Sequence, residues 1–252
     1  MIPSSKTCSF DKLQKQNPVQ SQNVWKALQV GIENLLNKKL VTPNVYLFLY
    51  QDRQKLQKLT QDIAVETARC FGNQEVIEMQ RKDFITQEGD DYGYAIEMYK
   101  QKIKKGKVLV IIHLNELPAN AARALHTICE TVNPIADGVV IFLTLNTWKQ
   151  VNSNSNSVQL AVDTLQELWG KQLGSNELDP LITRVTDQLC GGLCFWCGHL
   201  AEHLYTKHLT GHFHANHLHP NHLYSNHLYT NHLNTKHIDT NHIHSFHRSS
   251  SK

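Results

Sequence analysis

The chain has 252 residues, 40% of them hydrophobic, and a formal net charge of +3 with neutral histidines. This length allows one domain with a sizeable core and an additional segment. The small net charge argues against strong electrostatic attraction to nucleic acid or anionic lipid. No run of 18 apolar residues is present, and residues 1–18 lack the apolar region of a secretory signal, so we predict neither a membrane span nor a signal peptide.

Helical and strand patterns alternate along most of the chain. Residues 1–20 are polar and show no sustained period, so we predict a flexible leader there. Apolar residues at helical spacing predict helices, and continuous apolar runs predict buried strands. The helices are expected over 23–40, 52–71, 94–105, 119–132 and 158–173, and the strands over 44–50, 75–79, 108–114 and 138–145. This order predicts an α/β fold, with a mostly parallel sheet and helices on both faces.

The last helix of this region contains one isolated cation. Asp179 followed by Pro180 is typical of a helix start, and Leu181, Val185 and Leu189 would then form an apolar stripe. Arg184 lies beside that stripe, and it is the only lysine or arginine between positions 171 and 207. Its long side chain could simply reach water from the edge of the core, or it could have a function.

After this helix the composition changes abruptly. Of the 16 histidines, 14 follow Cys190, and seven of them, from His217 to His247, recur at intervals of five residues. A period of five fits neither a helix nor a strand, so we predict a disordered, low-complexity tail. We therefore divide the chain into a leader at 1–20, an α/β domain at 21–189, and a cysteine cluster with a His-rich tail at 190–252.

The cysteine cluster has the ligand types of a zinc site. Cys190, Cys194, Cys197 and His199 could close a tetrahedral site, although the spacing is not that of a common zinc finger. One of these cysteines could instead pair with Cys129 or stay free. We predict no metal site, and we attribute any metal binding by the tail to its density of ligands.

The sheet pattern resembles a nucleotide-hydrolysing core, but its phosphate-binding features are missing. The strand over 44–50 runs into QDRQKL with no glycine before Gly72, whereas a phosphate loop needs glycines and a lysine. Where the strand over 108–114 should deliver a magnesium-organising aspartate, the chain has His113 and Asn115, with Glu116 as a weak substitute. We therefore expect no nucleotide hydrolysis and no cofactor. Cys129 beside His126 is interpreted as a buried cysteine near a surface histidine, not a catalytic pair.

Two blocks of sequence resemble one protein family. Residues 100–146 contain a polar helix ending in Gly-Lys, a strand ending in His-Leu, a Leu-Pro-Ala helix start, a cysteine and a further buried strand. LDPLITRVTDQL, at 178–189, looks like the same family's closing helix, which carries one arginine. These blocks resemble the luminal domain of the torsin-interacting proteins of the lamina-associated-polypeptide type, over roughly residues 22–189.

The resemblance implies a function. The family's domain is similar to an AAA+ ATPase core that has lost nucleotide binding. It is not an enzyme itself but activates a neighbouring torsin-type AAA+ ATPase by inserting an arginine finger, which would be Arg184 here. The resemblance also implies location in the endoplasmic reticulum lumen or nuclear envelope, and a disulfide from Cys129 to Cys190, Cys194 or Cys197. The family's membrane anchor is expected ahead of the domain, yet this chain shows none, and the family has no histidine tract.

Two other functions remain open from the residues. The chain could bind nucleoside triphosphates through an unusual site, or it could bind metal through its Cys/His-rich C-terminal region. Nucleic acid is not an expected partner, because the charge is small.

Overall fold

The computed structural model describes residues 6–51, 53–86, 89–148, 156–186 and 193–194. The His-rich tail and its expected disorder lie outside the described residues, as do the side chains of Cys190, Cys194 and Cys197. Within the described ranges, no helix is long and apolar enough to cross a membrane.

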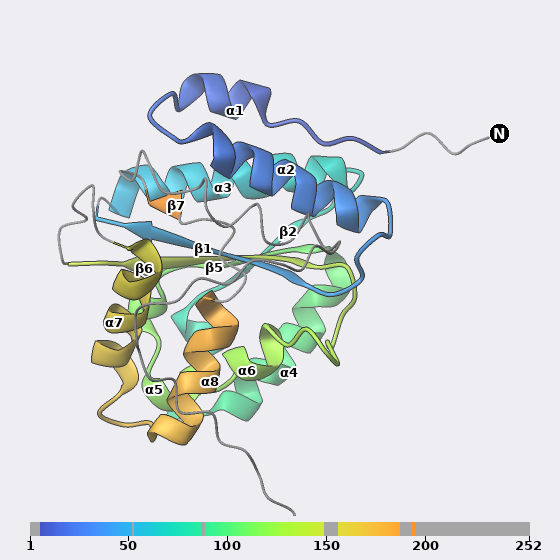
Figure 1. Cartoon of the computed structure of the whole chain (residues 1–252). Helices are drawn as coiled ribbons and strands as arrows, with labels where there is room; N and C mark the ends of the chain where they lie inside the picture. The colour runs from blue at the N-terminus through green and yellow to red at the C-terminus, as the bar shows by residue number, and fades with distance from the viewer. Residues whose placement is uncertain (1–5, 52, 87–88, 149–155, 187–192, 195–252) are drawn as a thin grey trace, which may run out of the picture. The chain divides into compact units, whose positions relative to one another are not determined.

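A parallel sheet forms the centre of the fold (Figure 1). Its strands lie in the order β2-β5-β6-β1-β7, and every neighbouring pair is parallel. β6 therefore separates β1 from β5. The bounds are β1 Asn44–Tyr50, β2 Val76–Met79, β5 Val108–Ile111, β6 Val140–Asn146 and β7 Leu193–Cys194, with a separate antiparallel pair of β3 Ile85–Thr86 and β4 Gly89–Asp90.

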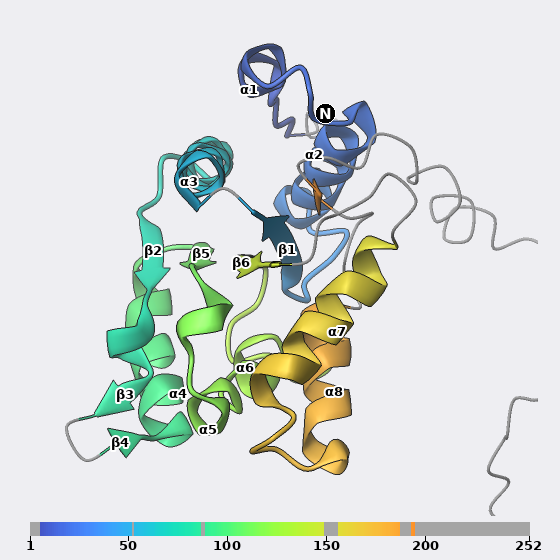
Figure 2. The ribbon, with the colours of Figure 1, turned by 90° about the vertical axis from the view of Figure 1, so that its left-hand side faces the viewer.

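Helices cover both faces of the sheet, which confirms the predicted α/β class (Figure 2). One face carries α1 Asp11–Gln16, α2 Gln22–Leu36 and α3 Arg53–Cys70. The opposite face carries α4 Tyr92–Lys102, α5 Ala119–Ala122, α6 Leu125–Ile128, α7 Ser157–Trp169 and α8 Ser175–Thr186. Short 3-10 turns occur at η1 Arg81–Asp83, η2 Ile103–Lys105 and η3 Leu114–Glu116.

The central strands are mostly apolar because both of their sides are buried. All seven residues of β1 are buried. Tyr46 and Phe48 belong to the core beneath α2 and α3, where both rings stack on Phe142 of β6 with centroids 5.5 and 5.7 Å apart. Leu47 and Leu49 belong to the core on the opposite side. Strand residues alternate between faces, so a two-sided core requires the continuous apolar run seen in the sequence.

Two predicted helices have different bounds in the structure. The helix expected over 119–132 is divided into α5 and α6, which are short and separated by two residues. The last helix begins at Ser175, so Asp179 is not its N-cap and Pro180 lies inside it. The earlier start is stabilised by burial of Leu178, and the backbone N–H groups of residues 177 and 178 both bond to the carbonyl of Gly174. The predicted stripe position Leu189 lies outside the described residues.

The N-terminal segment was expected to be a flexible leader, and this prediction is wrong for its described part. Phe10 and Leu13 are buried, and Phe10 packs against the ring of Trp25 with centroids 6.3 Å apart. A disulfide joins Cys8 to Cys70 at the end of α3. The side chains of Cys8, Phe10 and Leu13 therefore complete the core on the face covered by α2 and α3. Three buried residues are too few to produce a clear period in the sequence.

We predict that Cys8→Ser combined with Cys70→Ser lowers the free energy of unfolding. The disulfide closes a loop with a sequence separation of 62 residues, so its removal should cost about 4 kcal/mol through the greater entropy of the unfolded chain. Urea unfolding without reductant measures the difference. A reductant should bring the unreplaced protein to the same stability and leave the double variant unchanged. Equal stability of both proteins without reductant would contradict the prediction.

Candidate functional site

The carboxyl edge of the sheet is where a nucleotide would be expected. Ligands of open α/β folds bind there, between strands whose following helices cover opposite faces. β1 ends at Tyr50 and α3 begins at Arg53, so only residues 51 and 52 connect them. A phosphate loop wraps several backbone N–H groups around the phosphates between its strand and helix. A connection of two residues has no room for such a loop.

A polar network occupies this edge instead. The hydroxyl of Tyr50 bonds to Nδ1 of His113, and Nε of Arg53 donates to Nε2 of the same imidazole over 3.0 Å. Arg53 also forms a 2.7 Å ion pair with Glu116. His113 is buried and has a φ of 61°, a left-handed conformation that is uncommon for residues other than glycine. The network thus links the end of β1, the start of α3 and the turn after β5.

The bonds of His113 determine its protonation. Arg53 can only donate, so Nε2 of His113 must accept, and the ring proton of the neutral imidazole lies on Nδ1, facing the oxygen of Tyr50. Burial, and then the charge of Arg53, lower the pKa of His113. Burial likewise raises the pKa of the Tyr50 hydroxyl. Both groups are therefore neutral at physiological pH.

Further bonds fix the ends of β5 and β6 to each other. The backbone N–H of His113 donates to the hydroxyl of Thr144 over 2.7 Å. The side chain of Asn115 donates to the carbonyl of Asn146 over 2.9 Å and accepts from its N–H over 2.7 Å. The residues that stand in the expected magnesium-organising position are therefore engaged in internal bonds. Sequence reasoning identified that position but missed the contribution of Arg53.

Arg184 lies on α8, which covers the face of the sheet opposite α2 and α3. Its side chain is 38% exposed. Its NH2 group forms a 2.6 Å ion pair with Glu130, in the loop after α6. Its NH1 group donates to the carbonyl of His126 over 3.1 Å and lies 3.3 Å from Nδ1 of that residue. Arg184 is thus neither loose nor fully buried, and the structure holds its guanidinium in one place.

The acceptors around Arg184 are themselves held firmly. The Glu130 carboxylate accepts from the backbone N–H groups of Thr131 and Val132, each over 2.9 Å. The bond from Val132 and the charge of Arg184 hold the pKa of Glu130 below its usual range. Nε2 of His126 donates to the carbonyl of Glu177, 3.1 Å away, so its Nδ1 can accept from Arg184. Burial lowers the pKa of His126, which keeps this ring neutral.

Cys129 is fully buried next to this cluster and has a free thiol. The expected disulfide from Cys129 to Cys190, Cys194 or Cys197 involves side chains outside the described residues, so it stays a prediction. Burial raises the pKa of the thiol to about 12, so it stays protonated and is a poor nucleophile. This agrees with the interpretation that Cys129 and His126 are not a catalytic pair. Among the side chains that the structure describes, no group of His, Cys, Asp or Glu could hold a metal.

Comparison with known proteins gives one distant similarity. No family model matches the chain. A segment of the replicase polyprotein 1ab of Alphamesonivirus 1 is 27% identical over 187 residues, which is 71% of this chain and 4% of the polyprotein. The chain thus spans a small part of the curated relative that it matches. An identity this low over so small a part assigns no family and no activity.

We predict that Glu130→Gln lowers the free energy of unfolding by about 1–2 kcal/mol near pH 7, because the carboxylate carries charge-assisted bonds. The folded-state pKa of Glu130 is lowered, so its stabilisation is present above the unfolded pKa and is lost as the pH falls through the folded one. The difference between the two proteins should therefore stay constant near pH 7 and shrink as the pH falls below the ordinary glutamate pKa of about 4.3. Urea unfolding across this range measures it.

Glu97→Gln is the matched control, because Glu97 is exposed and its 2.7 Å ion pair with Lys100 lies within one helical turn. Exposed pairs of this kind contribute little to stability. A loss of stability in Glu130→Gln that does not change with pH would contradict the assignment.

Proposed function

We propose that this chain binds a torsin-type AAA+ ATPase and stimulates its ATP hydrolysis by presenting Arg184 to the partner's nucleotide. The chain itself would hydrolyse no nucleotide. The proposal rests on the resemblance of its closing helix and of residues 100–146 to the torsin-interacting proteins. The observation that supports it best is an AAA+-like strand order combined with a two-residue connection from β1 to α3. An ATPase-like domain with no space for a phosphate loop is suited to act on a neighbour's nucleotide.

The surroundings of Arg184 are compatible with an arginine finger. A finger stabilises the charge that spreads over the transferring phosphoryl group, which accelerates hydrolysis by roughly 10³–10⁵-fold. Such a group works best when it is already oriented. Leu181 and Val185 are buried and anchor α8, while Glu130 orients the guanidinium. The internal contacts use NH1 and NH2, so on docking the partner's phosphate would share or replace the Glu130 carboxylate.

The Cys8–Cys70 disulfide supports the proposed compartment. Disulfides persist in oxidising compartments and are rare in the cytosol. We therefore propose the endoplasmic reticulum lumen or nuclear envelope. The membrane anchor of the family remains an expectation from the resemblance.

The test of this proposal is Arg184→Ala, assayed with a purified torsin-type ATPase. Stimulated ATP turnover should fall to the partner's basal rate, while binding of the partner changes little. Arg184→Lys should restore little, because an ammonium lacks the planar fork that engages two phosphate oxygens. A measurement of stability does not distinguish an arginine finger from an arginine that only reaches water from the edge of the core. Loss of the ion pair with Glu130 should lower the free energy of unfolding in either case. Turnover does separate them.

Arg123→Ala is the matched control. Arg123, directly after α5, forms a 2.7 Å ion pair with Glu177 of α8, and its side chain is 32% exposed. The change should therefore cost similar stability and leave stimulation intact. Leu181→Asp should instead disrupt the packing of α8 and abolish binding together with stimulation. A folded Arg184→Ala protein that still accelerates the ATPase, or ATP turnover by the isolated chain, would refute the proposal.

The similarity to a replicase polyprotein favours a second candidate function, as a domain of a replication complex. That function predicts binding to nucleic acid. Fluorescence anisotropy with single-stranded RNA at about 150 mM salt distinguishes it, because non-specific electrostatic binding weakens steeply at that ionic strength. Tight RNA binding together with no stimulation of a torsin-type ATPase would favour the replicase function.

A further inference from the structure

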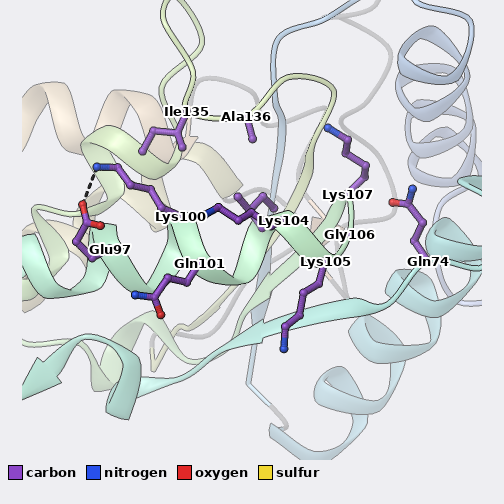
Figure 3. Close-up of a pocket in the computed structure, with 11 residues that line it drawn as sticks. Gln74, Glu97, Lys100, Gln101, Lys104, Lys105, Gly106, Lys107, Ile135 and Ala136 are labelled. Atoms are coloured by element: carbon purple, nitrogen blue, oxygen red, sulfur yellow. Dashed lines mark hydrogen bonds and ion pairs between the residues drawn. The ribbon is translucent and has the colours of Figure 1, made fainter.

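A basic pocket lies at the amino edge of the sheet, opposite the network of Tyr50 and His113 (Figure 3). Its volume is about 680 Å³. The end of α4, η2 and the residue before β5 form one side, and the loop before β6 forms another. The lining includes the lysines at 100, 104, 105 and 107, together with Ile135 and Ala136.

Positive charge predominates in this pocket. Among the described residues that line it, four are lysines and Glu97 alone is acidic. Glu97 is paired with Lys100, 2.7 Å away. Lys104 and Lys105 are exposed on η2. Lys107 lies beyond the helix, just before β5, where its Nζ donates to the carbonyl of Asp137 over 2.7 Å. The basic surface therefore extends from the helix to the loop before β6.

The backbone beneath the lysines is fixed. A Cβ on Gly106 would lie 2.4 Å from the carbonyl oxygen of Glu75, so only glycine allows the chain to pass so close to the start of β2. Lys105 and Lys107 flank this glycine. The backbone below the pocket is thus packed tightly against the start of β2.

The loop from Glu130 to Asp137 connects the pocket to Arg184. Glu130, at its start, holds the guanidinium of Arg184. Ile135 lines the pocket near the loop's end, and Asp137 binds Lys107. Between them Val132 is 80% exposed, the most exposed of the protein's large hydrophobic side chains that the structure describes. The eight residues 130–137 therefore contact Arg184 at one end and the basic pocket at the other. Val132, an exposed apolar side chain, lies between these two contacts.

The lining favours protein over nucleic acid as the ligand. Sites for single-stranded nucleic acid combine basic grooves with aromatic side chains on which bases stack. None of the described residues that line this pocket is aromatic, and its apolar part consists of aliphatic side chains such as Ile103 and Ile135. Aliphatic contacts within a basic rim are suited to an acidic protein surface with a small apolar centre.

We propose that the four lysines and the loop Glu130–Asp137 form the docking surface for an acidic surface of the partner ATPase. This inference rests on the proposed function. The lysines would guide and hold the partner, Val132 would be covered on binding, and Arg184 would be brought to the nucleotide at the interface. The docking surface would contribute affinity for the partner ATPase, and Arg184 would accelerate the partner's ATP hydrolysis.

The test is Lys104→Glu combined with Lys105→Glu, both on exposed side chains. The probe is a purified torsin-type ATPase with ATP bound and hydrolysis disabled. We expect its Kd to rise at least about tenfold near 100 mM salt, and the salt dependence of Kd to become weaker. With active ATPase, saturating amounts of the variant should restore maximal stimulated turnover to within about twofold. Lys104→Gln with Lys105→Gln should raise Kd by a smaller factor, and thermal melting should show that both variants are folded.

Lys12→Glu with Lys26→Glu is the control, because it makes the same change of charge at exposed positions on α1 and α2. The inference is overturned if this control weakens binding as much, if the tested variant binds as tightly as the unreplaced protein, or if the tested variant loses only RNA binding. Absence of any ATPase binding by the unreplaced protein would overturn the inference and the proposed function together. An Arg184→Ala protein that still stimulates, alongside weakened binding by the lysine variant, would refute the arginine finger and retain the docking surface.

Discussion

The parallel pairing of β1 with β6 is the interaction on which the rest of the fold depends. It runs over seven residue pairs from Asn44 with Val140 to Tyr50 with Asn146. Both strands are buried on both sides, so each needs a helical layer above and below. The layers then dictate where the chain can be functional. The faces of the sheet are covered by helices, so the polar groups that a ligand or partner can reach lie at the two edges, where strands meet loops, or on the covering helices, as Arg184 does on α8.

These two edges carry opposite chemistry. At the carboxyl edge Arg53 is paired with Glu116, His113 is neutral, and Asn115 is bonded to the backbone of β6. At the amino edge four lysines line the pocket, and among the described lining residues Glu97, which is paired with Lys100, is the only acidic one. Buried polar groups at the ends of the strands are costly when they are left unpaired, so the carboxyl edge needs partners for them. Internal side chains satisfy them here.

The sequence predicted what depends on local pattern and missed what depends on distant pairing. Continuous apolar runs identified β1, β5 and β6, because burial on both sides requires them. The order of those strands and the ion pair of Arg184 with Glu130 involve residues far apart in the chain, which no local period records. The Cys8–Cys70 disulfide was missed for the same reason. The start of α8 was misplaced because Asp179 and Pro180 are a strong local signal that the burial of Leu178 overrides.

The ion pair between Arg184 and Glu130 also bears on how an arginine finger could be regulated by its own fold. A free guanidinium on the surface would have many rotamers, and ordering it on docking would cost entropy. Glu130 removes that cost by fixing the group in advance, but its charge also offsets part of the field that a phosphate would feel. The exchange is favourable only where a more highly charged acceptor replaces the carboxylate, because a phosphoryl group offers more negative oxygens than Glu130 does. Arg184 would thus remain in its internal pair beside neutral or weakly charged surfaces and would engage a nucleotide only in a docked partner.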